Sequence, residues 1–310
     1  MSKKKSTQTL ENRSLISIAD LSKEEIEKLL KSAAQFKKSP PKNLLQGQIL
    51  ASCFFEPSTR TRLSFEAAML KLGGQVIGFS DASSTSMKKG ESLSDSMKII
   101  GGLSDLIVIR HPMEGAARLA SQSTTKPVIN AGDGANQHPT QTLLDLFSIK
   151  ECQGRLEGLN VAIVGDLKYG RTVHSLAYAA ALFDMRLYFV SPEELTLPET
   201  VLQQLRKMRG KFSFHHTIEE VIGKVDILYM TRLQKERFDE SVYEKVKESY
   251  ILKEALLKKA QKHLKVLHPL PRVNEIEISI DKTPYAYYFQ QAENGLFVRQ
   301  ALLAHILGKK

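Results

Sequence analysis

The chain has 310 residues, of which 42% are hydrophobic, and its formal net charge is +10 at pH 7. This length buries a sizeable core and predicts two domains, while the ordinary composition excludes a wholly disordered chain. No apolar run approaches the ~18–20 residues that a membrane-spanning helix needs, so the sequence predicts no membrane partner.

The cysteine content and the first residues indicate the compartment. The only cysteines are Cys53 and Cys152, and we interpret them as reduced thiols, since they are too few for a disulfide framework or a zinc site. The basic start continues into no apolar segment and is not typical of a secretory signal. We therefore expect a cytoplasmic protein without a metal.

Half of the net charge lies at the two ends of the chain, in Lys3, Lys4, Lys5, Lys309 and Lys310. A basic chain can bind nucleic acid, but the sequence has no recognition motif and no interleaving of aromatic and basic residues. Surplus Arg and Lys also serve sites for anionic substrates. The motifs below favour this second use, and we expect no nucleic-acid partner.

Short apolar segments alternate with helical patterns along the chain. This alternation predicts parallel strands covered by helices on both faces, and hence an α/β fold with two doubly wound domains, each a mainly parallel sheet. Residues 62–72 predict one such helix, because their apolar side chains recur at helical spacing. The predicted strands are residues 48–55, 75–79, 105–110 and 127–130, then 160–164, 186–190, 226–230 and 265–267.

The boundary between the domains is predicted from a long helical pattern at about residues 140–151, which Gly154 and Gly158 follow. We place the first domain at residues 1–140 and the second at residues 141–295. Residues 80–90 are small and polar without apolar anchors, so we expect a mobile loop there.

Polar clusters follow the predicted strands. Ligands of open parallel sheets bind at the carboxyl ends of the strands, so an enzyme of this class should place its polar residues there. The clusters do follow strands in both halves: residues 56–62, 110–111 and 138 in the first, and 166–171, 231–234 and 268–272 in the second.

Residues 56–62 predict an anion site. Pro57 ends the strand, Ser58 and Thr59 supply hydroxyls to cap a helix, and arginines follow. A helix N-terminus with free N–H groups, hydroxyls and arginine is suited to phosphate. The segment lacks the glycine-rich spacing of a Walker loop, and the glycines near residue 165 lack the spacing of a dinucleotide fingerprint, so no nucleotide cofactor is predicted.

The segment Ser58-Thr-Arg-Thr-Arg62 resembles the carbamoyl-phosphate signature of the aspartate and ornithine carbamoyltransferase family. The resemblance continues over nearly the whole chain, and its second half is similar to the aspartate branch. It implies transfer of a carbamoyl group from carbamoyl phosphate to L-aspartate, a step of pyrimidine biosynthesis, without a cofactor. The further matching segments are residues 138–145, 165–174, 229–237, 268–272 and 288–291.

The resemblance implies a carbamoyl-phosphate site. Its residues are Ser58, Thr59, Arg60 and Thr61 for the phosphate, Arg110 between phosphate and carbonyl oxygen, His138 and Thr61 as donors to that oxygen, Gln141 for the carbamoyl amide, and Pro269 and Leu270 as backbone acceptors.

The resemblance also implies an aspartate site and an assembly. Arg171, Arg232 and Gln234 would hold the two carboxylates of aspartate, with Leu270 beside them. Ser86 and Lys89 would enter the site of a neighbouring subunit, where both contact carbamoyl phosphate and Lys89 also contacts aspartate, which implies a homotrimer with shared sites. Glu56 would pair with Arg171 and Arg237 in a closed form, and a last helix at residues 296–310 would return to the first domain. Whether regulatory chains bind stays open.

The residue types fit this chemistry independently. A dianionic leaving group and a dicarboxylate demand several cations, and arginine binds both groups through two parallel hydrogen bonds. Donors aimed at the oxyanion of a tetrahedral intermediate are worth ~2.7–4 kcal/mol each. The resemblance thus implies that Arg60, Thr61, Lys89, Arg110 and His138 are the catalytic residues, and their types suit this chemistry.

Three alternatives remain. An ornithine carbamoyltransferase would share the first half, but it usually has a His-Cys-Leu-Pro motif where this chain has Pro269 after His268. A catalytically silent scaffold would lose residues of the phosphate segment, which are all present here. A basic nucleic-acid binder of the same fold would show strong salt-dependent binding.

Overall fold

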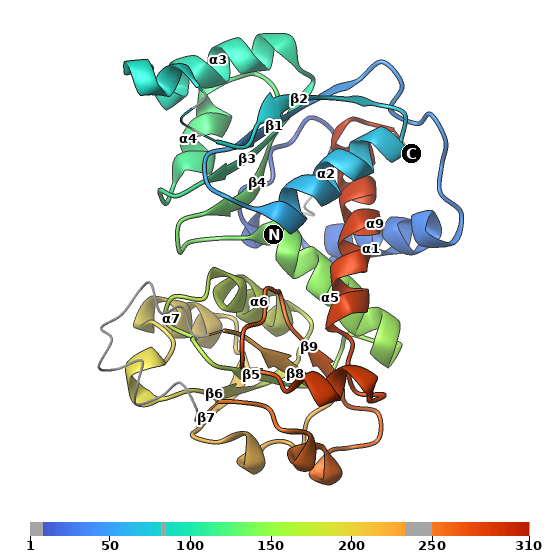
Figure 1. Ribbon diagram of the computed structural model, residues 1–310, viewed down its shortest axis with the longest axis vertical. Coiled ribbons are helices and arrows are strands. Elements are labelled where there is room, and N and C mark those ends of the chain that lie inside the picture. Colours follow the sequence, from blue (N-terminus) through green and yellow to red (C-terminus); the bar gives the residue numbers. More distant parts are fainter. Residues whose placement is uncertain (1–8, 82, 84, 233–249, 310) are drawn as a thin grey trace, which may run out of the picture. The chain divides into compact units, whose positions relative to one another are not determined.

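The computed structural model describes residues 9–81, 83, 85–232 and 250–309. The chain divides into two compact units (Figure 1). Unit 1 consists of Met1–Thr140 and Gly295–Lys310, and unit 2 of Gln141–Asn294. Two helices, α5 (Pro139–Gln153) and α9 (Tyr288–Ile306), contribute residues to both units.

Unit 1 is built on a parallel sheet with the strand order β2-β1-β3-β4. The chain leaves β1 for β2 on one side and later adds β3 on the other, so the direction of winding reverses at β1. The strands are β1 (Ile49–Phe54), β2 (Gln75–Phe79), β3 (Leu106–His111) and β4 (Val128–Asp133).

Helices cover both faces of this sheet. Ala51 and Cys53 of β1 face a buried cluster with Met97 of α3 (Leu93–Leu103) and Ala117 of α4 (Ala116–Ser123). Side chains of a strand alternate between the faces, so Ser52 points to the other side. There its hydroxyl donates to Glu66 of α2 (Thr59–Lys71) over 3.0 Å.

The end of the chain packs within unit 1. The hydroxyl of Ser32, in α1 (Lys23–Lys38), lies 2.8 Å from Nε2 of His305 in α9. The guanidinium of Arg299 lies 5.0 Å from the centre of the Phe65 ring of α2. Short 3-10 helices lie between the longer elements. They include η1 (Ile18–Asp20) and η3 (Ser86–Lys89) in unit 1, and η4 (Glu193–Leu195) in unit 2.

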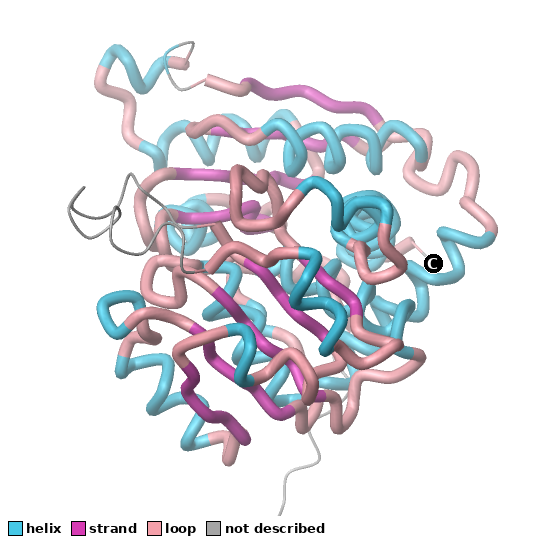
Figure 2. The backbone as a smooth tube through the Cα atoms, turned by 60° about the horizontal axis from the view of Figure 1, so that its bottom comes forward, coloured by secondary structure: helices cyan, strands magenta, loops and turns pink. Residues whose placement is uncertain are grey.

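Unit 2 is also built on a parallel sheet in which the winding reverses, with the strand order β7-β6-β5-β8-β9. Its winding reverses at β5, which lies between β6 and β8. Figure 2 shows these strands running side by side. They are β5 (Asn160–Val164), β6 (Arg186–Val190), β7 (Lys211–His215), β8 (Ile227–Met230) and β9 (Lys265–Leu267).

The two faces of this second sheet are covered differently. Leu228 and Met230 face a buried cluster with Ile218 and Leu257, which come from η5 (Ile218–Glu220) and η7 (Glu254–Lys259). The opposite face is covered by α6 (Arg171–Leu182) and α7 (Glu199–Lys207) (Figure 1). The described cover of the first face consists mainly of short 3-10 helices and loops, with η8 (Ile278–Lys282) among them, and of Tyr288 at the start of α9.

The predicted α/β fold with parallel sheets is confirmed, and each predicted strand is present with an end shifted by a few residues at most. One strand, β7, was missed. It lies at the sheet edge, and its alternating pattern of Phe212, Ser213 and Phe214 is short and partly exposed. The helix predicted from residue 62 begins at Thr59, and the last helix begins at Tyr288 instead of residue 296. Among the described residues, no helix has the length and apolar character to cross a membrane.

Candidate active site

Within each unit, predicted site residues lie close together at the carboxyl edge of the sheet, where the direction of winding reverses. In unit 1, the last residue of β1, Phe54, pairs with Arg110 of β3. The turn after β1 contains Glu56 and Ser58, so it lies at the same sheet edge as Arg110. In a parallel sheet the reversal is where loops diverge to opposite faces and leave room for a ligand.

The turn after β1 leads into a helix N-terminus with basic character. Ser58 is the N-cap of α2, but its hydroxyl makes no capping bond, which corrects the predicted capping role. The first turn of α2 has no acidic residue, so the positive end of its dipole is not neutralised there. Partial burial lowers the pKa of Arg60 from its ordinary value. Thr61 is buried, whereas Thr59 and Arg60 remain exposed.

Arg110 is held beside this turn by two contacts. Its Nε lies 2.8 Å from a carboxylate oxygen of Glu56, and its carbonyl oxygen accepts from the N–H of Phe55 over 2.9 Å. Only 16% of the Arg110 side chain is exposed. Glu56 therefore orients Arg110 within unit 1. Its predicted pairing with Arg171 and Arg237 stays a prediction, since Arg237 lies outside the described residues.

His111 is neutral in this surrounding. Its Nδ1 accepts from the N–H of Met113 over 3.0 Å, so that nitrogen holds no proton. Burial lowers the pKa of His111, although Glu56 and Asp133 act in the opposite direction. The ring packs against Phe55 with 5.0 Å between ring centres. We interpret His111 as a structural residue that stabilises the chain next to Arg110.

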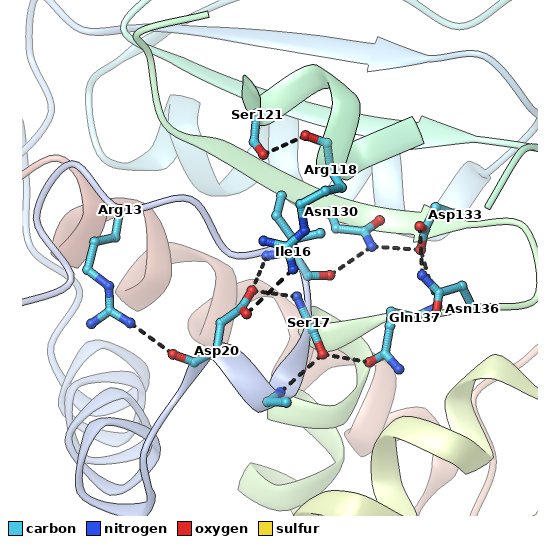
Figure 3. Close-up of polar contacts among 11 residues, drawn as sticks. Arg13, Ile16, Ser17, Asp20, Arg118, Ser121, Asn130, Asp133, Asn136 and Gln137 are labelled. Carbon is cyan, nitrogen blue, oxygen red and sulfur yellow. Dashed lines mark hydrogen bonds and ion pairs between the residues drawn. The ribbon is translucent and has the colours of Figure 1, made fainter. Parts of the chain in front are cut away.

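A buried carboxylate organises the segment before His138 (Figure 3). Asp133, at the end of β4, is 0% exposed and accepts from the side-chain amides of Asn130 and Asn136. It also accepts from the backbone N–H groups of Gly115 and Gln137. These bonds fix the turn of residues 133–137, because they tie its backbone to two neighbouring segments.

The N-terminal segment braces the same turn (Figure 3). The carboxylate of Asp20 accepts from the N–H groups of Ile16 and Ser17, and the Ser17 hydroxyl donates to Gln137 over 3.3 Å. His138 follows directly and is 4% exposed, with its Nδ1 3.5 Å from the hydroxyl of Thr140. Its ring is therefore held at the start of α5.

In unit 2 the corresponding turn follows β5. Gly165 has a φ of 115°, and a Cβ there would lie 2.5 Å from the carbonyl oxygen of Thr231, so the two turns approach too closely for a side chain. The carboxylate of Asp166 accepts from the N–H groups of Lys168 and Tyr169. These constraints shape the turn that ends at Arg171, the first residue of α6.

Arg232 lies at the same edge of the second sheet. Thr231 continues β8 by bonding through its N–H and its hydroxyl to the carbonyl of Val164, each over 2.9 Å. Arg232 follows, so it and Arg171 come from the turns after two adjacent strands, and both are half-buried. The predicted Gln234 lies outside the described residues.

The predicted backbone acceptors follow β9. The N–H of Leu270 donates to Nδ1 of His268 over 2.7 Å, so the other ring nitrogen, Nε2, carries the proton. Nε2 donates to Glu275 over 2.6 Å. The His268 ring therefore connects Glu275 to the backbone of Leu270 and holds the turn at Pro269 and Leu270. Leu270 adopts a positive φ of 56° in this turn.

Glu275 closes this turn from the other side. Its second oxygen accepts from the N–H groups of Val273 and Asn274, each over 3.0 Å. Burial raises the pKa of Glu275, but the hydrogen bonds from His268 and Val273 outweigh it, so the pKa lies below its ordinary value. The carboxylate is thus the stable form in the folded chain.

A further buried carboxylate, Asp145 of α5, connects four elements of unit 2. One oxygen accepts from the side-chain amides of Gln141 and Gln291, over 2.8 and 2.6 Å. The other accepts from the hydroxyl of Tyr229 over 2.8 Å. Gln291 in turn accepts from the N–H of His268 over 2.8 Å. Gln141 and the turn at Pro269 are therefore parts of one polar network.

Two family models match the chain. The carbamoyl-phosphate-binding domain of aspartate/ornithine carbamoyltransferases matches residues 13–151, and their Asp/Orn-binding domain matches residues 157–306. The chain belongs to the aspartate/ornithine carbamoyltransferase family. Within described residues of this family member, no group of three or more His, Cys, Asp or Glu side chains is arranged to hold a metal ion.

Relatives of this carbamoyltransferase are similar over nearly their whole length. It is 58% identical over 295 residues to the aspartate carbamoyltransferase catalytic subunit of Chromobacterium violaceum, covering 95% of this chain and 98% of the relative. It is also 58% identical over 306 residues to that of Vibrio vulnificus CMCP6, covering 98% and 99%.

Solved structures of the family share the fold. The catalytic subunit of M. jannaschii aspartate transcarbamoylase is 50% identical, with a TM-score of 0.89 over 96% of this chain and 98% of that one. The Trypanosoma cruzi enzyme in complex with carbamoyl phosphate and aspartate is 37% identical, with a TM-score of 0.91 over 96% and 98%.

The sequence interpretation missed the carboxylates that position the site. Asp133, Asp145, Asp166 and Glu275 received no role, although each accepts hydrogen bonds next to a predicted residue. A signal existed for Asp145, because it lies four residues after Gln141, the spacing at which side chains of a helix meet. For the other three, only the folded turns reveal the partners.

Replacing Glu275 with Gln should destabilise the chain. The amide has one acceptor oxygen, so its NH2 group must face either the His268 N–H or the two backbone N–H groups. A buried donor without an acceptor costs about 1–3 kcal/mol. We expect the free energy of unfolding at pH 7, measured by urea titration, to fall by that amount.

The pH dependence of this loss follows from the direction of the Glu275 pKa shift. The folded pKa is below the ordinary value, so the stabilisation is complete above the unfolded pKa and is lost as the pH falls through the folded pKa. The difference between wild type and E275Q should therefore shrink in acid. Glu277→Gln, which changes an exposed acid nearby, serves as the control. A loss as large for E277Q, or one that grows in acid, contradicts the assignment.

Proposed function

We propose that this chain transfers the carbamoyl group of carbamoyl phosphate to the amine of L-aspartate, giving N-carbamoyl-L-aspartate and phosphate. The observation that carries the proposal is the pair of basic sheet edges. Arg60 and Arg110 lie at the strand reversal of unit 1, and Arg171 and Arg232 at that of unit 2. The full-length similarity to aspartate carbamoyltransferase catalytic subunits supports it.

Unit 1 is assigned to carbamoyl phosphate in this proposal. The N-terminus of α2 offers N–H groups and the side chains of Ser58, Thr59, Arg60 and Thr61 to a phosphate. Arg110, oriented by Glu56, bridges the phosphate and the carbonyl oxygen, towards which His138 donates. His138 serves as a hydrogen-bond donor in this assignment.

Unit 2 is assigned to aspartate. Two carboxylates require two sets of donors, which Arg171 and Arg232 supply with planar guanidinium groups. Gln234 adds a donor from outside the described residues. The carbonyl oxygens of Pro269 and Leu270 accept from the attacking amine or the carbamoyl NH2, in a turn held by His268 and Glu275.

The chemistry is an acyl transfer. The amine nitrogen attacks the carbonyl carbon, a C–N bond forms, and the carbonyl oxygen becomes an oxyanion. The bond from carbon to the bridging oxygen then breaks, phosphate leaves with its electron pair, and the proton lost by the nitrogen passes to the departing phosphate. Donors already in place around the oxyanion lower the barrier without reorganisation.

The assembly and location belong to the same proposal. We infer a cytoplasmic homotrimer in which Ser86 and Lys89 enter the site of a neighbouring subunit. Both side chains are exposed in η3, so they are available to a second chain. Regulatory chains are compatible with this assembly.

The deciding experiment supplies the purified chain with carbamoyl phosphate and either L-aspartate or L-ornithine, and identifies the product. N-carbamoyl-L-aspartate without citrulline supports the proposal. Citrulline would show that the amino-acid half has been misinterpreted. Neither product from a folded trimer would favour a scaffold without catalysis.

Arg60→Ala should reduce turnover by about 10²–10³-fold, the loss typical of removing one donor to a developing charge. The control is Lys71→Ala, which removes the same charge from the exposed far end of α2. Steady-state kinetics of both variants provide the measurement. A near-normal rate for R60A excludes the phosphate role of Arg60.

Arg232→Ala should chiefly weaken the use of aspartate. Hydrogen bonds to a charged group contribute ~1.5–3 kcal/mol, so KM for aspartate should rise by about 10–150-fold. Arg186→Ala removes an exposed arginine from the amino end of β6 and should leave KM unchanged. An unchanged aspartate dependence in R232A argues against the assignment.

Mixing Arg60→Ala subunits with Lys89→Ala subunits should restore activity if sites are shared. Random assembly of the two inactive variants leaves roughly a quarter of the sites with both native residues, one from each neighbour. The activity of the reassembled mixture is compared with each variant alone. Absence of rescue in a mixture shown to contain hybrid trimers contradicts the shared site.

A further inference from the structure

Asp145 has a position that the proposed mechanism does not use. Its side chain is fully buried on α5, four residues after Gln141 and therefore on the same helix face. A buried carboxylate is costly unless its oxygens accept several hydrogen bonds. Asp145 accepts at least three, and two of these come from side-chain amides.

An ionised carboxylate accepts hydrogen bonds and donates none. The amide group that faces it must therefore present its NH2 end. For Gln141 this places Nε2 on Asp145 and leaves Oε1 as the acceptor for another partner. A reversed amide would bring two oxygens together and direct the NH2 group away from Asp145.

The same rule applies to the second amide. Gln291 donates from Nε2 to Asp145, so its oxygen is the end that accepts from the N–H of His268. That N–H belongs to the residue before the turn of Pro269 and Leu270. One carboxylate thus sets both the direction of the Gln141 oxygen and the position of the turn with the backbone acceptors.

We propose that Asp145 is a positioning residue that aims acceptor oxygens at the NH2 group of carbamoyl phosphate, and so lets the enzyme select a carbamoyl over an acetyl donor. This inference rests on the proposed function. The acceptors are Oε1 of Gln141 and the carbonyls of the turn after His268.

Acetyl phosphate is the ligand that isolates this effect. It has the phosphate and the carbonyl group of carbamoyl phosphate, and it replaces the NH2 group with a methyl group of similar size. The phosphate contacts are the same for both ligands. Only the acceptors for NH2 distinguish them, because a methyl group cannot donate and leaves these acceptors without a partner.

A purely structural role for Asp145 makes a different prediction. If the network only joined α5, β8 and α9, its loss would weaken the two ligands alike or leave both unchanged. The ratio of the dissociation constants of acetyl phosphate and carbamoyl phosphate therefore separates positioning from general stability. This discrimination ratio is measured by titration calorimetry on the full-length chain.

Asp145→Ala is the main variant. It removes the acceptor, so the Gln141 amide is free to reverse. We expect the affinity for carbamoyl phosphate to fall by about tenfold, the equivalent of 1.4 kcal/mol, and that for acetyl phosphate to stay within about twofold. The discrimination ratio should then approach one. If the alanine variant does not fold, Asp145→Ser is used, with the same direction expected.

Two control variants alter the same network without reversing Gln141. Tyr229→Phe removes the bond to the other oxygen of Asp145 and the hydroxyl's contacts with Thr172 and Gln141, but it leaves the Gln141 amide bonded to Asp145. Asp145→Asn can turn its oxygen to the two glutamine amides and its NH2 group to the Tyr229 oxygen. Both should retain most of the discrimination ratio. A ratio lost equally in Y229F, or kept in D145A, overturns the inference.

The outcomes distinguish this inference from the proposed function. A wild-type chain that fails to bind carbamoyl phosphate contradicts the function itself. A wild-type chain that binds it and discriminates against acetyl phosphate, together with a D145A chain that discriminates equally well, contradicts only the role of Asp145.

Discussion

Parallel strand pairing with a reversal of winding is the constraint on which the site depends. Right-handed crossovers place successive helices on one face until the chain changes direction, after which they lie on the other. The reversal occurs between β1 and β3 in unit 1 and between β5 and β8 in unit 2. The turns at these strand ends diverge to opposite faces of the sheet, which leaves room for a ligand at that edge. The two sets of predicted arginines lie at these two edges.

Within each unit, buried acids have structural roles, whereas partly exposed arginines are available to substrates. Asp133, Asp145 and Asp166 are fully buried and accept hydrogen bonds from turns and amides. Carboxylates suit this role because each oxygen accepts more than one bond, and bonds to a charged acceptor are stronger than neutral ones. Arg60, Arg171 and Arg232 keep contact with solvent and can receive anions. The acids hold the backbone, and the bases bind substrates.

Backbone hydrogen bonds fix the tautomers of two histidines. His111 and His268 each accept from a backbone N–H at Nδ1, two residues further along the chain. An imidazole that accepts at one nitrogen donates at the other, so neither ring needs a positive charge. The cations of the proposed site are then the arginines and Lys89 of a neighbouring subunit. Neutral histidines also avoid repulsion with those arginines.

The amino-acid sequence by itself determined the alternation of strands and helices, because apolar periodicity follows directly from burial on one or both faces. It also led to the prediction of anion-binding residues, because arginines follow the ends of predicted strands. Strand β7 escaped prediction because an exposed edge strand needs little apolar character. Only the tertiary structure decided which acid serves which turn. The contact of Glu56 with Arg110, and that of Asp145 with Gln291, join residues far apart in the chain. Such pairs form by the packing of separate elements, and local sequence patterns do not encode them.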